Sequence, residues 1–214
     1  STAPWSYQPS VKLYIATNNV HKVGELKSLL KNKLPDIQVD GANKFGGIPE
    51  VEESAGTFEG NALLKARALH QLVDEGSWTL SDDSGLVVDA LNGEPGIYSA
   101  RFAGLNATDD DNRKKLLKSM EGIPSPMRQA RFICILALLG PGDQEHAFPG
   151  ACEGSISLEE RGSDGFGYDP IFIPEGHKNT FGILPPGLKN RISHRARAFE
   201  QLVAFLNQQK RRGS

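Results

Sequence analysis

The sequence predicts an α/β protein built on a mixed sheet. Apolar, strand-like segments alternate along the chain with amphipathic helical segments, which is the order expected when helices pack against a sheet. The clearest strand is Arg131–Leu139 (RFICILALL), which is apolar, rich in strand-forming residues and bounded by Pro141-Gly142. There is no internal repeat and no long low-complexity linker, so we expect one large domain, or two lobes that share one core.

The first part of the chain predicts one strand and two helices. Val11–Thr17 (VKLYIAT) is expected to be a short buried strand. A helix follows Asn18-Asn19 and ends near Pro35, and the residues spaced to form its apolar face are Val23, Leu26, Leu29 and Leu30. A second helix is expected over Thr57–Val73, with these residues toward the core: Ala62, Leu63, Ala66, Leu69 and Leu72.

The remaining elements follow in order. Trp78–Leu80 is expected to be a strand that leads into a turn at Ser81–Gly85, and Asp109–Met120 a helix that is polar on one side. Ala147–Leu158 can supply one or two more strands. The chain should close with a helix over Ser193–Gln208, whose inward residues are Ala198, Leu202, Phe205 and Leu206.

Composition narrows the functional class. Residues 11–208 are expected to form the folded domain, with a disordered lead-in at 1–10 and a basic tail at 209–214. The formal net charge of −2 does not favour nucleic acid or an anionic membrane, and no apolar run is long enough to span a bilayer. The lead-in lacks the features of a secretory signal. Two cysteines without a CxxC pair favour free thiols and a reducing cytosol.

The segment Ala16–Glu25 (ATNNVHKVGE) is the first that suggests a phosphate site. A loop between a strand and a helix N-terminus offers free N–H groups and the positive end of a helix dipole. Lys22 adds a full charge, and Asn18 and Asn19 add amide donors. The alternative is an Asn-rich turn that only caps the helix, since no glycine-rich phosphate loop is present.

The segment Ser81–Leu91 (SDDSGLVVDAL) suggests a metal site. Two adjacent carboxylates in a tight turn can direct Asp82 or Asp83 at one point, and Mg²⁺ needs only one or two protein carboxylates beside water and phosphate oxygens. The Glu52-Glu53 pair is a candidate to complete the site, although its distance is not given by the sequence. A solvated Asp-Ser-Gly turn is the simpler alternative.

Two later segments suggest a site for a planar, polar ligand. In Gly162–Pro170 (GSDGFGYDP), glycines beside Phe166 and Tyr168 allow close backbone approach and present an aromatic face, although a glycine-rich hairpin has the same pattern. Lys189–Arg195 (KNRISHR) places basic residues at the expected start of the last helix. Cations there oppose the helix dipole, which hints at a ligand outside the helix.

The order of these segments resembles the Ham1/RdgB family of inosine and xanthosine triphosphate pyrophosphatases from about Leu13 to Leu206. The matching motifs are ATNNVHK from Ala16, ESAGTFEGNALLKA from Glu53, DDSGLVVDALNGEPGIYSARFAG from Asp82, GFGYDPIF from Gly165 and KNRISHRARA from Lys189. The resemblance implies an elongated mixed α/β structure of two lobes around a central nucleotide cleft. It also implies a homodimer.

The resemblance further implies roles for particular residues. Asp83 would be general base and metal ligand, with Glu53 helping to hold Mg²⁺ and Lys22 as a second catalytic group. The triphosphate loop would comprise Thr17, Asn18, Asn19, Val20, His21 and Lys22. The remaining nucleotide-binding residues would be Ser84, Phe166, Gly167, Tyr168, Asp169, Lys189, His194 and Arg195.

The reaction implied is Mg²⁺-dependent hydrolysis of ITP, dITP or XTP to the monophosphate and pyrophosphate, which clears deaminated purines from the nucleotide pool. Lys22, the Asn18-Asn19 loop and Lys189 would balance the charge of the leaving group, and Asp82 could share the role of base. One alternative is a pyrophosphatase acting on a modified pyrimidine or another nucleoside triphosphate. A nucleotide-binding regulator without turnover is the other.

Overall fold

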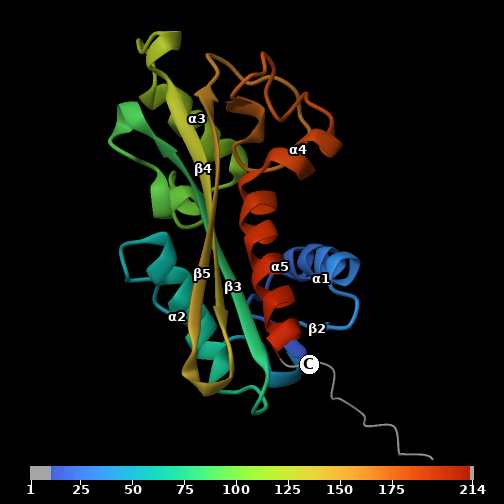
Figure 1. The fold of residues 1–214 in the computed structure, drawn as a ribbon. Coiled ribbons are helices and arrows are strands. Elements are labelled where there is room, and N and C mark those ends of the chain that lie inside the picture. The colour runs from blue at the N-terminus through green and yellow to red at the C-terminus, as the bar shows by residue number, and fades with distance from the viewer. Residues whose placement is uncertain (1–10, 213–214) are drawn as a thin grey trace, which may run out of the picture.

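A computed structural model describes residues 11–212, so the expected lead-in at 1–10 and residues 213–214 of the expected tail lie outside the described part. The strands are β1 (Lys12–Ile15), β2 (Gln38–Asp40), β3 (Trp78–Val88), β4 (Gln129–Leu139), β5 (Glu145–Ile156) and β6 (Phe172–Pro174). The helices are α1 (Val20–Lys33), α2 (Phe58–His70), α3 (Asp109–Ser119), α4 (Pro186–Ile192) and α5 (His194–Arg212). Figure 1 shows the long strands β3, β4 and β5 running through the molecule with helices on both sides.

The sheet is mixed, as the sequence predicts. Its strand order is β2-β1-β3-β4-β5-β6. β1 is parallel to β2, to which α1 connects it as a crossover, and it is also parallel to β3. The pairs from β3 to β6 are antiparallel.

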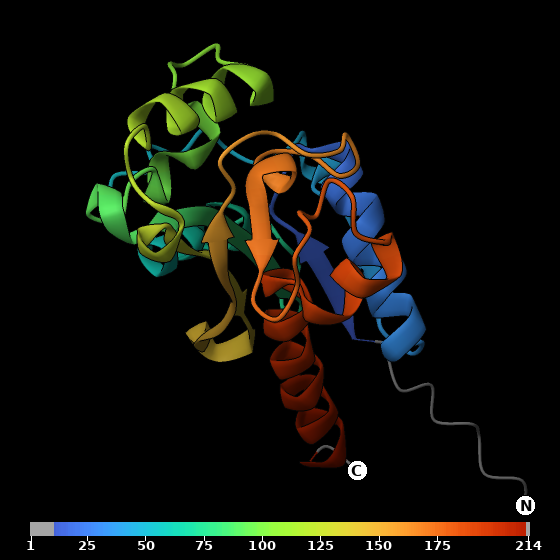
Figure 2. The same cartoon turned by 90° about the horizontal axis from the view of Figure 1, so that it is seen from above.

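Helices cover both faces of the sheet because side chains alternate along each strand. On β4, Ala137 and Leu139 pack against α2, whereas Leu136 and Leu138 pack in the cluster that includes α1 and α5. Viewed from above in Figure 2, α1 and α3 lie on opposite sides of the molecule with strands between them.

Two hydrophobic cores lie toward the two ends of the long strands. The first joins β1, α1 and α5 to the start of β3 and the end of β4. The second joins α3, β6 and the loop around Tyr168 to the other ends of β3 and β4. The chain therefore forms two lobes that share one sheet, and the middle of β3 lies between their cores.

The expected turn at residues 81–85 is wrong, because these residues continue β3 as far as Val88. Residues 79–88 all pair with β4. These long-range hydrogen bonds outweigh the local preference of Ser, Asp and Gly for turns. Gly85 is required by packing, since a Cβ there would collide with the carbonyl oxygen of Gly96.

The C-terminal region also differs from the expectation. Lys189 does not lie at the start of the last helix but in α4, which ends before Ser193, and α5 begins at His194. Residues 209–212 of the expected tail are helical, since α5 continues to Arg212. Cations at its C-terminal end favour this extension, and Lys210 also pairs with Asp36 at 3.2 Å.

Smaller differences concern short strands and exposed leucines. β2 and β6 have three residues each and no alternation long enough to identify them in the sequence. Leu29 and Leu72 were expected on buried helix faces but are exposed. No helix within residues 11–212 is long and apolar enough to cross a membrane.

Arg128 closes the end of the second core. It is almost completely buried, and its guanidinium donates to the backbone carbonyl oxygens of Met120, Ile123, Ile156 and Ser157. Its removal would take a buried donor away from each of these acceptors.

We therefore expect Arg128→Met to lower the free energy of unfolding by roughly 2–5 kcal/mol. Arg131→Met is the matched control, because Arg131 pairs with the half-exposed carboxylates of Asp89 and Glu153 and its loss should cost about 1 kcal/mol or less. Urea unfolding followed by circular dichroism measures both. Equal small losses in the two variants would show that the buried hydrogen bonds of Arg128 do not stabilise this lobe.

Candidate active site

The site lies where β1 leaves the edge of β3. β1 pairs with β3 only as far as Leu80, while β3 continues to Val88. Beyond Leu80 this edge of β3 is therefore free of β1. The chain leaves the carboxyl end of β1 and enters α1, so a helix N-terminus lies beside the free edge. This is the kind of crevice in which open α/β sheets bind ligands.

Asp82 is a buried carboxylate at this edge. Lys22 from α1 lies 3.2 Å from its Oδ2, and Arg195 from α5 lies 3.9 Å from the same atom. Ser84 Oγ donates to it at 3.5 Å. Burial works against ionisation, yet the charges of Lys22 and Arg195 outweigh it and hold the pKa of Asp82 below its usual value. Asp82 thus remains ionised and fixes two cations from different helices.

Asp83 lies on the opposite face of the strand in a different environment. Lys65 Nζ from α2 lies 3.8 Å from Asp83 and 3.2 Å from Glu53. Burial raises the pKa of Asp83 to about 6. The positive charge of Lys65 opposes this rise, and the negative charge of Glu53 adds to it. Asp83 Oδ2 is buried and has no hydrogen-bond partner among the described residues. It is therefore free to accept a proton or a cation.

The structure brings Glu53 and Asp83 to the same lysine. Among residues 11–212, no group of three or more His, Cys, Asp or Glu side chains is arranged to hold a metal. Mg²⁺ usually takes only one or two ligands from protein carboxylates and the others from water and phosphate. A pair of carboxylates therefore suits it better than a complete cage of protein groups would.

The sequence interpretation missed Lys65. Its Nζ donates to the backbone carbonyl of Asp82 at 2.6 Å as well as pairing with Glu53. A signal was present, because Lys65 falls on the helix face of α2 that buries Ala62 and Leu69. A lysine on a buried face needs an anionic partner.

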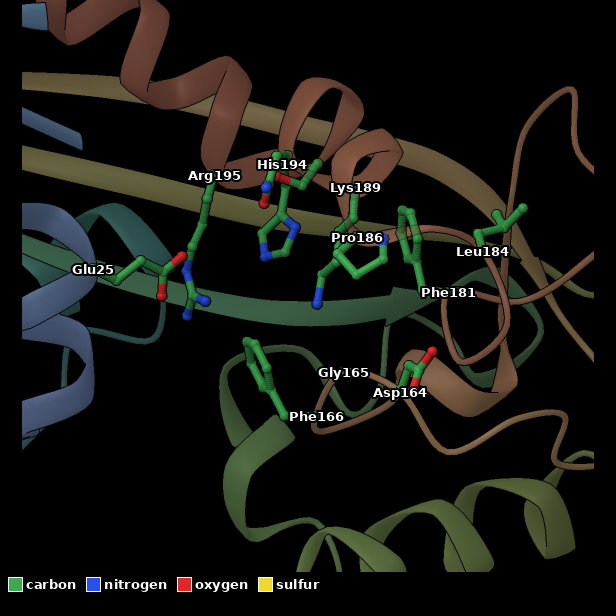
Figure 3. Close-up of a pocket in the computed structure, with 12 residues that line it drawn as sticks. Glu25, Asp164, Gly165, Phe166, Phe181, Leu184, Pro186, Lys189, His194 and Arg195 are labelled. Atoms are coloured by element: carbon green, nitrogen blue, oxygen red, sulfur yellow. The ribbon is translucent and has the colours of Figure 1, made fainter. Parts of the chain in front are cut away.

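The loop that carries Phe166 is held mainly through its backbone. Asp169 is buried, accepts a hydrogen bond from Phe166 N at 3.0 Å and pairs with Lys189. Gly165 has φ +76°, and a Cβ there would collide with the Asp169 carboxylate. Phe166 is 55% exposed. Lys189 Nζ lies 4.3 Å and Arg195 5.4 Å from the centroid of its ring, as Figure 3 illustrates.

His194 is not part of a cationic pair with Arg195. It stacks on Phe132 at 4.9 Å between ring centroids, and burial lowers its pKa to about 3, helped by the charge of Arg195. The ring is therefore neutral at physiological pH. Its Nδ1 is buried without a partner among the described residues and is available to a ligand.

Most of the expected ligand-binding residues line one cavity of about 200 Å³. They are Lys22, Ser84, Phe166, Gly167, Tyr168, Asp169, Lys189, His194 and Arg195. The adjoining cavity of Figure 3, about 250 Å³, shares Phe166, Lys189, His194 and Arg195 with it. Residues that were not expected also line the first cavity, among them Ser99, Asp109, Asn112 and Phe132.

Three other residues of the expected triphosphate loop face a different hollow. Thr17, Asn18 and Val20 line a hollow of about 400 Å³ between α1 and the residues after β2. Asn18 Oδ1 accepts from Ile48 N at 3.0 Å, and Asn19 Oδ1 accepts from Lys22 N at 3.2 Å, so both amides hold the loop. The side chain of His21 lies outside what the structure describes. Among the loop residues whose side chains the structure describes, Lys22 reaches the main cavity.

Comparison with known proteins agrees with this architecture. The Ham1 family model matches residues 13–205. A protein of Opitutus terrae named dITP/XTP pyrophosphatase is 46% identical over 199 residues, which cover 91% of this chain and 98% of that protein. One of the same name from Desulforamulus reducens is 47% identical, with 92% and 96% covered.

Solved structures give the same result for the fold. The Ham1 protein of Staphylococcus aureus superimposes with a TM-score of 0.84 at 39% identity, covering 92% of this chain and 99% of that chain. A HAM1 protein of Coxiella burnetii gives 0.83 at 38% identity, with 92% and 99% covered. These matches confirm the expected α/β fold of a mixed sheet with flanking helices.

The raised pKa of Asp83 predicts a stability effect that varies with pH. Between pH 3.8, the ordinary pKa of this carboxyl, and about pH 6, the native state keeps a proton on Asp83 that the unfolded chain has mostly lost. The contribution of Asp83 to the free energy of unfolding therefore falls as the pH rises through this window. Asp83→Asn carries no such penalty and should be more stable than wild type at pH 7.5 by roughly 1–2 kcal/mol, after allowance for solvent screening.

Urea unfolding of both proteins at pH 4 and pH 7.5, with a chelator present, measures this difference. The advantage of Asp83→Asn should be mostly lost at pH 4, because this pH is close to the ordinary pKa of 3.8 and little of the window up to about 6 has been crossed. A difference of the same size at both pH values would show that Asp83 titrates with an ordinary pKa.

Proposed function

This chain belongs to the Ham1 family, and we propose that it hydrolyses deaminated purine nucleoside triphosphates, such as dITP, ITP and XTP, to the monophosphate and pyrophosphate. One observation carries the proposal. A single cavity is lined by an exposed aromatic ring, two cations beside that ring and a lysine from α1. It borders the strand that bears Asp82 and Asp83. The aromatic ring and its two cations suit a nucleotide base, the lysine of α1 suits the triphosphate, and the acids of the strand suit a hydrolytic centre.

The base would stack on Phe166 and be recognised by the groups around it. Hypoxanthine and xanthine have a carbonyl at C6, which can accept a hydrogen bond from Arg195 or Lys189. Adenine has an amino group at this position, so two donors would face each other and both would be left unpaired. Each such buried group costs roughly 1–3 kcal/mol. The neutral imidazole of His194, with its unpartnered Nδ1, can donate or accept and is suited to another edge of the base.

We propose that Lys189 serves the base and not the leaving group. Its Nζ pairs with Asp169 and lies over Phe166, so it belongs to the end of the cavity that would hold the base. Lys22 and Lys65 are better suited to the triphosphate, because they lie beside Asp82 and Asp83 on the central strand. Their charges would neutralise the phosphate oxygens as pyrophosphate leaves.

We also propose that Asp83 and Glu53 bind Mg²⁺. The free Oδ2 of Asp83 and the proximity of Glu53 fit a hard cation, which prefers oxygen ligands. Magnesium would supply charge neutralisation at the phosphates and polarise them for attack. Lys65 lies between the two carboxylates and would hold them together before substrate binds.

Asp83 is also better suited than Asp82 to accept a proton from the attacking water. Asp82 has a lowered pKa and is engaged by Lys22 and Arg195. In the metal-free protein the pKa of Asp83, about 6, leaves it ionised at neutral pH but more basic than an ordinary carboxylate, and a bound cation would reduce this basicity. We therefore assign the role of base to Asp83 and not to Asp82.

The proposal extends to the compartment and the assembly. Cys134 and Cys152 are free and buried, which suits a reducing cytosol. The family resemblance favours a homodimer, and light scattering of the purified protein should then give twice the chain mass of 23.2 kDa. A monomer mass at micromolar concentration would remove this part of the proposal.

Phosphorus NMR of a digest tests the reaction. With Mg²⁺, we expect ITP, dITP and XTP to give the monophosphate and pyrophosphate, while ATP, GTP, dUTP and TTP react far more slowly. A chelator should abolish turnover, and so should Asp83→Asn in a folded protein. Inosine diphosphate and orthophosphate as first products would contradict the mechanism, and faster turnover of a pyrimidine nucleotide would replace the substrate class.

Arg195→Ala tests recognition of the base. We expect kcat/KM for ITP to fall about 10- to 100-fold and that for ATP much less, so that the selectivity ratio falls. Arg191→Ala is a suitable control, since Arg191 is exposed on α4 and should leave the ratio unchanged. Equal proportional losses for ITP and ATP would assign Arg195 to the phosphates instead.

A further inference from the structure

Helix α3 binds both backbone groups of one residue in the Phe166 loop. Asp109 Oδ2 accepts from Gly167 N at 3.0 Å, and Arg113 Nη1 donates to Gly167 O at 2.7 Å. Asp109 and Arg113 are four residues apart in α3 and so lie on the same face of the helix. This spacing lets one helix face bind the N–H and the C=O of a single residue.

Arg113 is itself held in place. Its Nε donates to Glu160 Oε1 at 2.5 Å, and its Nη2 lies 3.8 Å from Asp110. Its side chain is 16% exposed. A planar guanidinium with two fixed partners loses little further freedom when it binds a carbonyl. Arg113 therefore connects Glu160 to Gly167. These two residues lie near the two ends of the segment that leads into the aromatic loop.

The Phe166 loop needs support of this kind. Phe166 lies between Gly165 and Gly167, which have φ values of +76° and +59°, and glycine leaves the backbone many alternative conformations. Phe166 belongs to none of the hydrophobic cores and is more than half exposed. Its direction is therefore set by the backbone of the loop more than by packing of the ring.

We propose that Asp109 and Arg113 are positioning residues that hold Phe166 in the direction needed to stack on the purine base. The inference rests on the proposed function, because it takes Phe166 as the surface on which the base stacks. Without these two contacts the loop would have to be ordered during binding, and this cost would weaken nucleotide binding. The phosphate end would be unaffected, since it is built on β3, α1 and α2.

Loss of the Arg113 contact should not unfold α3. Leu116 and Met120 anchor the helix in the second core. Asn112 also ties it to the preceding segment, with Oδ1 accepting from Ala103 N at 2.8 Å and Nδ2 donating to Ala100 O at 3.1 Å. A variant at Arg113 can therefore be examined as a folded protein.

The experiment compares Arg113→Met with Lys114→Met, which removes a neighbouring cation that is 73% exposed and pairs with Asp110 at 2.7 Å. Arg113→Met should raise KM for ITP about five- to tenfold with kcat within about twofold, while the inhibition constant of inorganic tripolyphosphate stays unchanged. Lys114→Met should leave all three values unchanged. Asp109→Ala should act like Arg113→Met, whereas Asp109→Asn keeps an acceptor oxygen and should retain most of the wild-type KM.

Amide hydrogen exchange of the ligand-free protein supplies a readout that does not depend on the substrate. Residues 165–168 should exchange about tenfold faster or more in Arg113→Met and Asp109→Ala, and at the wild-type rate in Lys114→Met. Unchanged exchange would overturn the inference, and so would an unchanged KM. A parallel loss of tripolyphosphate binding would also overturn it, because the substitution would then act through the whole fold.

Failure of the proposed function gives a different pattern. Wild type would then not hydrolyse ITP at all, while the exchange measurement would still decide whether α3 holds the loop.

Discussion

The buried carboxylate of Asp82 is the constraint on which the site depends. A charge in the interior is tolerated only if cations and hydrogen bonds compensate for the lost water. Lys22 and Arg195 provide this compensation, and they come from α1 and α5, which are far apart in the chain. Both helices must therefore approach the middle of β3. The cavity for a ligand lies where they meet, between the two cores, and neither lobe could form it alone.

The alternation of side chains along a strand divides the work between two adjacent acids. Asp82 faces cations and stays ionised, so it orders the site. Asp83 faces the other side, where burial makes it a stronger base and leaves one oxygen free. A turn would direct both carboxylates into one region, where their like charges would repel. A strand separates them and gives them different protonation behaviour, although they are neighbours in sequence.

The two ends of the cavity are built by different means. The end with Lys22 and Ser84 stands on a helix and a central strand, so its geometry is fixed by the rigid sheet. The end with Phe166 stands on a loop with glycines on both sides of the ring, and its geometry depends on contacts to the backbone from Asp169 and α3. Fixed charges suit phosphate, whereas a surface supported by a loop suits the stacking of a planar ring.

The sequence by itself determined the features that depend on local signals. Thr57 Oγ1 accepts from Gly60 N at 3.0 Å and caps the start of α2, and the apolar run of β4 is a strand. The order of the motifs also identified the family and most residues of the cavity. Only the tertiary structure decided that residues 81–85 extend a strand, that Lys65 lies between Glu53 and Asp83, and that His194 is neutral. These outcomes depend on strand pairing and burial between residues far apart in the chain. Lys22 and Asp82, for example, are 60 positions apart, and local sequence preference acts only over a few residues.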